Sequence, residues 1–102
     1  MKVLITGTTQ GIGKAIAELF LNKGHQVIGI DRQAPSIVAP SYIHHQCDIR
    51  DMNTLPELDD VEILINNAGT QNEDDIDINL KSLIRLTEKY GVRKGIRSIL
   101  NI

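Results

Sequence analysis

The chain has 102 residues, of which 41% are hydrophobic and 24% charged, and its formal net charge is -2. This size and composition fit one globular domain over residues 1–102, and the near-neutral charge gives no basic surface for nucleic acid. A single cysteine excludes an internal disulfide, and no apolar run is long enough to span a membrane, so we expect a cytoplasmic protein without a membrane partner.

The first element is predicted to be a buried parallel strand over residues 2–6, because its apolar run shows no alternation. A glycine-rich turn follows it. Residues 12–23 then predict a helix, with one apolar stripe facing a sheet at Ile12, Ala15, Ile16, Leu19 and Phe20. Gly24 stands where a glycine commonly ends a helix.

A strand, a glycine turn and a helix in this order build a site for a phosphate group. Glycine lets the backbone bend sharply and approach a ligand closely. The start of the helix offers unpaired N–H groups at the positive end of the helix dipole. The stretch TGTTQGIG at residues 6–13 is therefore the candidate phosphate-binding turn, and the weak net charge favours a small nucleotide over a polymer as its ligand.

The remaining elements alternate between strand and helix. Further strands are expected at residues 27–30, 42–47 (polar, and hence an edge strand), 61–65 and 97–102. Residues 33–41 are predicted to be a loop in place of a fuller crossover helix, and residues 51–59 a short helix interrupted by Pro56. The alternation predicts an α/β fold, a Rossmann-type doubly wound parallel sheet with strand order 3-2-1-4-5.

A second long helix is expected between the fourth and fifth strands. Asn72 is a candidate N-cap with Asp75 in the capping-box position, and the helix runs to about Tyr90, where Gly91 ends it. The acidic residues 73–75 and Asp77 fit the positive start of this helix, and a cation site is the alternative.

Polar markers follow the carboxyl ends of four predicted strands, at Gly7, Asp31, Asp48 and Asn66. Ligands bind at that edge of an open parallel sheet. Asp31, 24 residues after Gly7, can accept hydrogen bonds from a ribose 2′-hydroxyl and would repel a 2′-phosphate, which favours NAD over NADP. Arg32 beside it could instead pair with a 2′-phosphate. A simple turn-forming aspartate is the alternative reading of Asp31.

These motifs together resemble the short-chain dehydrogenase/reductase family, in its N-terminal cofactor-binding half. The resemblance is carried by the spaced glycines, the acidic residue after the second strand, Asp48-Ile49 and the block NNAG at residues 66–69. It implies an NAD(P)-dependent oxidoreductase acting on a small alcohol or carbonyl substrate, with NAD favoured further because Gln10 is not basic. The cofactor-binding residues that we take forward are Gly7, Thr8, Thr9, Gln10, Gly11, Ile12, Gly13, Asp31, Arg32, Asp48, Ile49, Asn67, Ala68 and Gly69.

The resemblance also implies a catalytic residue, Asn79, which would hold a water that relays protons; from the residues alone, Asn79 is a packed helix position. The family's Ser and Tyr-x-x-x-Lys belong after the fifth strand, where this sequence ends, so we expect the chain alone to be catalytically incomplete. Tyr90 and Lys94 match the Tyr-x-x-x-Lys spacing, but they precede that strand, and we interpret Tyr90 as a core residue.

Other readings remain open. A metal site at His44, His45 and Cys47 is not favoured, because successive strand residues point to opposite faces and no second ligand cluster is evident. A dinucleotide-binding or redox-sensing module without catalysis, and a partner-binding domain with a vestigial site, are the alternatives to an enzyme. With the fifth strand at a sheet edge, we also expect self-association, that is, a homo-oligomer.

Overall fold

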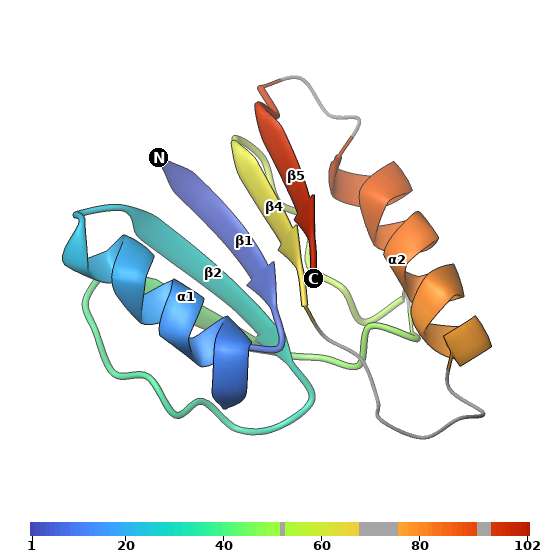
Figure 1. Ribbon diagram of the computed structural model, residues 1–102, viewed down its shortest axis with the longest axis horizontal. Helices are drawn as coiled ribbons and strands as arrows, with labels where there is room; N and C mark the ends of the chain where they lie inside the picture. The colour runs from blue at the N-terminus through green and yellow to red at the C-terminus, as the bar shows by residue number, and fades with distance from the viewer. Residues whose placement is uncertain (52, 68–75, 92–94) are drawn as a thin grey trace.

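The structure is a computed structural model that describes residues 1–51, 53–67, 76–91 and 95–102, with the backbone alone for residues 76–80. Five parallel strands form one sheet in the order β3-β2-β1-β4-β5, which confirms the predicted topology (Figure 1). The elements are β1 Lys2–Thr6, α1 Gly11–Asn22, β2 Gln26–Asp31, β3 Tyr42–Gln46, β4 Ile63–Asn66, α2 Ile76–Tyr90 and β5 Ser98–Asn101.

The register of the strands brings their carboxyl ends to one edge of the sheet. Thr6 at the end of β1 pairs with Ile30 of β2, Asp31 pairs with Gln46 of β3, and Asn66 of β4 pairs with Asn101 of β5. The carboxyl ends of β1, β2 and β4 therefore lie close together, at the edge where the polar markers were expected (Figure 1).

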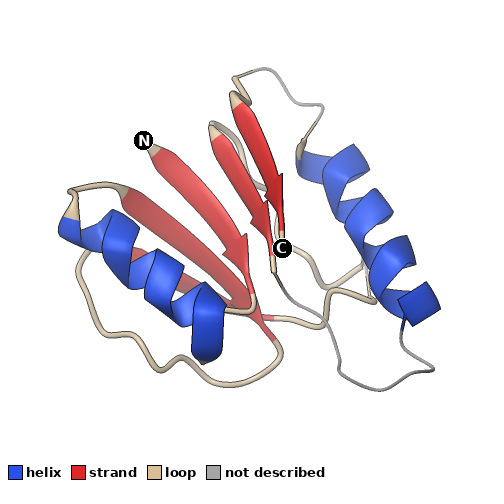
Figure 2. Ribbon diagram, in the orientation of Figure 1, coloured by secondary structure: helices blue, strands red, loops and turns tan. Residues whose placement is uncertain are grey.

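Two apolar clusters lie on opposite faces of the sheet, because alternate strand residues point to opposite sides. On one face α1 packs through Ala17 against β1, β2 and β4, and Ile37 from the connection between β2 and β3 joins this cluster. On the other face α2 packs through Leu86 and Tyr90 (Figure 2). The loop prediction for residues 33–41 is confirmed, and one buried isoleucine takes the place that a crossover helix would fill.

Helix α1 packs along a different line from the predicted stripe. Gly13 and Ala17 are its buried residues, Ile16, Phe20 and Leu21 are partly buried, and Ile12, Ala15 and Leu19 are exposed. Small residues at i and i+4 let the helix backbone come close to the sheet, and this turns the outer part of the apolar stripe towards solvent. The prediction placed the whole apolar stripe against the sheet and was wrong for Ile12, Ala15 and Leu19.

Two further expectations concern the second half of the chain. Where it is described, the segment 51–59 contains a turn and irregular structure, so the prediction of a short helix there is wrong. Leu55 and Leu58 of this segment nevertheless belong to the apolar core. Helix α2 ends at Tyr90 as predicted, and Gly91 N–H donates to Thr87 O at 2.8 Å. The predicted cap residues Asn72 and Asp75 lie outside the described residues. Neither described helix has the length and apolar character that crossing a bilayer requires.

Candidate functional site

The glycine turn after β1 leaves the start of α1 open. Gly7 and Gly11 have φ values of 79° and 62°, a left-handed region that favours glycine. Gly7 N–H donates to Ile30 O at 2.8 Å, which joins the turn to the end of β2. Gln10 is the extended N-cap residue of α1, and its side chain makes no capping hydrogen bond. The first N–H groups of α1 therefore have neither a helical partner nor a side-chain cap, an arrangement suited to an anion.

Gly13 brings the first turn of α1 against the backbone of the glycine turn. A Cβ atom at position 13 would lie 1.9 Å from Gly7 O and 2.4 Å from the side-chain nitrogen of Asn67. No side chain fits in that space without moving the backbone. The third glycine of the motif is therefore required for close packing, and not for an unusual φ angle.

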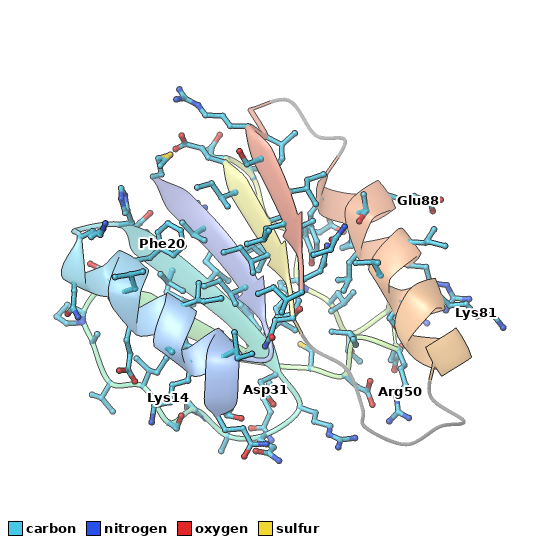
Figure 3. The ribbon with its side chains drawn as sticks, in the orientation of Figure 1. Lys14, Phe20, Asp31, Arg50, Lys81 and Glu88 are labelled. Atoms are coloured by element: carbon cyan, nitrogen blue, oxygen red, sulfur yellow. The ribbon has the colours of Figure 1, made fainter. Side chains whose placement is uncertain are left out.

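Asp31 lies at the end of β2, where the glycine turn that follows β1 holds its side chain (Figure 3). Its Oδ2 accepts hydrogen bonds from Thr9 N–H at 3.1 Å and from Thr9 Oγ1 at 2.9 Å. Its Oδ1 accepts the N–H of Gln33 at 2.9 Å. A carboxylate has about four acceptor positions, so these three bonds orient the group and leave room for one more donor on Oδ1.

The loop between β2 and β3 closes over the same turn. Ser36 Oγ donates to Thr9 O at 2.6 Å, and the amide oxygen of Gln33 lies 3.1 Å from Thr9 Oγ1. The sequence did not mark either residue, because a loop of serine, proline and glutamine carries no signal for the turn that it will contact. Arg32, the predicted neighbour of a 2′-phosphate, is exposed, and its carbonyl accepts Gln46 Nε2 at 3.2 Å.

Asn67 ties β1 to the end of β4. Its N–H donates to Thr6 Oγ1 at 3.0 Å, and its Nδ2 donates to Gly7 O at 3.1 Å. Its neighbour Asn66 donates from Nδ2 to Asn101 Oδ1 at 2.9 Å, across the pair of strands β4 and β5. The remaining predicted residues of the NNAG block, Ala68 and Gly69, lie outside the described residues.

Asp48 is paired with Arg50 immediately after β3. The guanidinium donates to both carboxylate oxygens, with the shortest distance 2.6 Å from the terminal nitrogen to Oδ2. The hydrogen bonds from Arg50 lower the Asp48 pKa to about 2 against an opposing effect of burial, and the positive charges of Arg50 and Arg32 act in the same direction. Ile49 packs against the core on the α2 face.

Three residues bear on proton transfer: Asn79, which the resemblance implies, and Tyr90 and Lys94, whose spacing we interpreted as a coincidental match. Asn79 lies in the first part of α2, for which the backbone alone is described. Tyr90 is fully buried and its hydroxyl donates to Pro56 O at 2.7 Å, which confirms it as a core residue. Lys94 lies outside the described residues. The described residues thus bring the glycine turn, Asp31 and Asn67 together at one sheet edge and bring no tyrosine–lysine pair to it.

His44, His45 and Cys47 do not converge. His44 Nδ1 lies 2.7 Å from Tyr42 Oη, whereas Cys47 Sγ donates to Thr54 O at 3.0 Å. Burial lowers the pKa of His45, and the nearby His44 lowers it further. Across the described ranges, no three His, Cys, Asp or Glu side chains are grouped as a metal ion would need.

Comparison with known proteins places this arrangement in a family. The model of a family described as short chain dehydrogenase matches residues 1–90. The NADP-dependent 3-hydroxy acid dehydrogenase of Salmonella typhi is 32% identical over 68% of this chain and 34% of that protein. The 15-hydroxyprostaglandin dehydrogenase [NAD(+)] of Homo sapiens is 33% identical over 79% of this chain and 39% of that protein.

Solved structures agree in fold. Serine dehydrogenase from Escherichia coli matches 99% of this chain with a TM-score of 0.81 and 26% identity, over 61% of that chain. Aldohexose dehydrogenase from Thermoplasma acidophilum, in ligand-free form, matches 98% with a TM-score of 0.73 and 25% identity, over 48% of that chain. The chain spans well under half the length of the two curated relatives: 34% of the Salmonella typhi protein and 39% of the Homo sapiens protein.

Proposed function

Because the chain belongs to the short-chain dehydrogenase family, we propose that it is the cofactor-binding part of an NAD(P)-dependent oxidoreductase. The substrate class is a small alcohol or carbonyl compound, and the bound nicotinamide would supply or accept the hydride. One observation carries the proposal. The uncapped start of α1 and the Asp31 carboxylate lie at the same sheet edge, and Thr9 links them at 2.9 Å and 3.1 Å.

The residues divide into those for the pyrophosphate and those for the adenosine end. Gly7, Gly11, Ile12 and Gly13 would hold the pyrophosphate at the start of α1, with Thr8, Thr9 and Gln10 in the same loop. Asp48 and Ile49 would contact the adenine. Asn67, Ala68 and Gly69 would line the adenosine ribose and support the central strand. These assignments come from the family resemblance and remain predictions.

NAD is the preferred cofactor in this proposal. Asp31 has an acceptor position left on Oδ1 for a ribose hydroxyl, and a carboxylate there repels a 2′-phosphate. Arg32 is the counter-argument, because its charge lies near enough to act on Asp48. The two relatives are named for different cofactors, so they do not decide between NAD and NADP for this chain.

Catalysis by this chain alone is not part of the proposal. Asn79 would hold a water in the proton path, and the described residues bring no tyrosine–lysine pair to the site. A redox-sensing module that binds the dinucleotide without turnover is the competing function.

Titration of the purified chain with NADH and with NADPH, followed by nicotinamide fluorescence, tests the proposal. We expect saturable binding of both, with NADH tighter. No binding of either would contradict the proposal and favour a partner-binding domain. Binding without turnover over a panel of alcohols and carbonyls would favour the sensor or a cofactor-binding part that does not catalyse by itself.

A further inference from the structure

We propose that Tyr42, on the edge strand β3, is a positioning residue for the nucleotide-binding turn: its hydroxyl, held by His44, fixes Thr8 above β2. The inference rests on the proposed function and adds to it a residue outside the glycine motif. Tyr42 is not itself one of the predicted cofactor-binding residues, and its hydroxyl contacts one of them, Thr8. It acts through Thr8, which lies between Gly7 and Thr9 in the turn.

The three side chains form one continuous chain of hydrogen bonds. Thr8 Oγ1 lies 2.6 Å from Tyr42 Oη, Tyr42 Oη lies 2.7 Å from His44 Nδ1, and His44 Nε2 lies 2.9 Å from Gln33 O. The carbonyl of Gln33 can only accept, so Nε2 of His44 carries a proton. In the neutral imidazole Nδ1 then accepts from Tyr42, and the Tyr42 oxygen accepts from the Thr8 hydroxyl. Each hydroxyl hydrogen therefore has one defined direction.

Gly29 shows that the neighbouring strand is adapted to this contact. A Cβ atom at Gly29 would lie 2.0 Å from Tyr42 Oη and 2.5 Å from Thr8 Oγ1. Any side chain on that face of β2 would occupy the place where the two hydroxyls meet. Glycine is unfavourable inside a strand and commonly marks a close approach of other groups. Positions 8, 29 and 42 thus depend on one another.

The contact between Thr8 and Tyr42 lies in the turn that would bind the ligand's phosphate groups. The Thr8 side chain is fully buried, and on either side of it the turn is held by Gly7 N–H to Ile30 O and by Thr9 to Asp31. Thr8 is the residue between these two fixed points, and the peptide groups that follow it lead into the open start of α1. Burial and the nearby Asp31 charge raise the pKa of Tyr42, against the lowering effect of the Thr8 hydrogen bond, so its hydroxyl stays neutral.

Four proteins test the inference: the unaltered chain, Tyr42→Phe, Thr8→Val and the double variant. Both substitutions remove one hydroxyl and nearly preserve shape. We expect each single variant to bind NADH and ADP about 10-fold more weakly. The affinity for adenosine, which lacks phosphate, should change less than about twofold when it is measured by displacement of NADH. The double variant should bind no more weakly than the weaker single variant, because both remove the same contact.

Tyr90→Phe is the matched control, since it also removes a buried tyrosine hydroxyl that is bonded to a neighbouring group, but on the other face of the sheet. It should leave NADH affinity within about twofold. Circular dichroism melts establish that each variant is folded, and if Tyr42→Phe does not fold, His44→Phe, which removes the group that holds the Tyr42 hydroxyl, takes its place with the same expected loss. Unchanged NADH affinity in Tyr42→Phe, additive losses in the double variant, or an equal loss for adenosine would overturn the inference.

The failure of the proposed function looks different. If the unaltered chain binds neither NADH nor ADP, the proposed function fails and this inference fails with it. If the unaltered chain binds NADH and the Tyr42→Phe and Thr8→Val proteins bind it equally well, only the inference is lost.

Discussion

The backbone N–H of Thr9 donates to Asp31 Oδ2 at 3.1 Å, so the end of β2 holds the turn that follows β1. An aspartate that was expected to face a ribose is therefore also a structural acceptor for the phosphate-binding turn. One side chain links the two halves of the proposed nucleotide site, and a change in either half should be felt in the other.

Asp31→Ala is expected to weaken NADH binding by about 10-fold or more and NADPH binding by less, because only the unphosphorylated ribose loses a favourable acceptor. Fluorescence titration of both nucleotides measures the ratio. Thr9→Val is the control, since it removes the hydroxyl bond to Asp31 and keeps the carboxylate, and it should change the NADH to NADPH ratio little. An unchanged NADH affinity in Asp31→Ala would show that the ribose assignment is wrong.

Gly13→Ala should damage both stability and nucleotide binding. The added methyl group would meet Gly7 O at 1.9 Å, so the helix must move away from the turn. We expect a loss of about 2–3 kcal/mol in the free energy of unfolding, as for other overpacked sites. Urea denaturation measures it, with Glu18→Ala on the exposed side of α1 as the control. A Gly13→Ala protein as stable as the unaltered chain would contradict the packing described here.

Arg50→Gln should raise the pKa of Asp48 from about 2 towards its ordinary value of 3.8. The folded-state pKa lies below the unfolded value, so the pair stabilises the fold above about pH 4, and this contribution is lost as the pH falls towards 2. The pair is partly exposed, so its effect on stability should be small. Carboxyl ¹³C NMR titration follows Asp48 directly. Lys14→Gln, which alters the ion pair between Lys14 and Glu18 on α1, should leave the midpoint of the Asp48 titration unchanged.

Tyr90→Phe should destabilise the fold by about 1–2 kcal/mol, because the Pro56 carbonyl loses its tyrosine donor. Chemical denaturation gives this value. Tyr90→Leu would remove ring packing as well and should cost more. A Tyr90→Phe protein that keeps full stability but loses nucleotide binding would mean that this tyrosine serves the site after all.

Self-association through the surface around β5 is expected, because the strand lies at the edge of the sheet and its apolar side chains are exposed. Ile99 and Leu100 are 39% and 50% exposed, and Ile102 beyond the strand is 56% exposed. Sedimentation velocity should show a concentration-dependent shift, reduced by Leu100→Lys and unaffected by Val38→Lys, an exposed residue of the loop between β2 and β3. A sharp monomer peak at all concentrations would contradict this.

The strands were predictable because local signals mark them, and their order because alternating strands and helices follow the rules for parallel crossovers. Continuous apolar runs mark buried parallel strands, and glycine, aspartate and asparagine follow their ends. The orientation of α1 was not predictable in the same way. Hydrophobic spacing alone favoured Ile12 and Leu19 as inward residues, whereas the close approach allowed by Gly13 and Ala17 decides which face is buried.

The contacts around the glycine turn could not be predicted from the sequence either. Gln33, Ser36 and Tyr42 meet Thr8 and Thr9 only because β2 and β3 place them beside the end of β1. Their residue types are common in loops and edge strands, so nothing in their local pattern indicates a partner 24–34 positions away. Asp31 was predicted as a ligand-facing group, but its bonds to Thr9 were not.

The glycine turn takes its anchors from three separate segments: Ile30 and Asp31 of β2, Tyr42 of β3, and Asn67 after β4. It cannot reach its final shape until β1, β2, β3 and β4 have assembled, so it has no native form in a partly folded chain. Amide hydrogen exchange at Thr9 should therefore report global unfolding and not local opening. During folding, the ability to hold a nucleotide would be among the last properties that the molecule acquires.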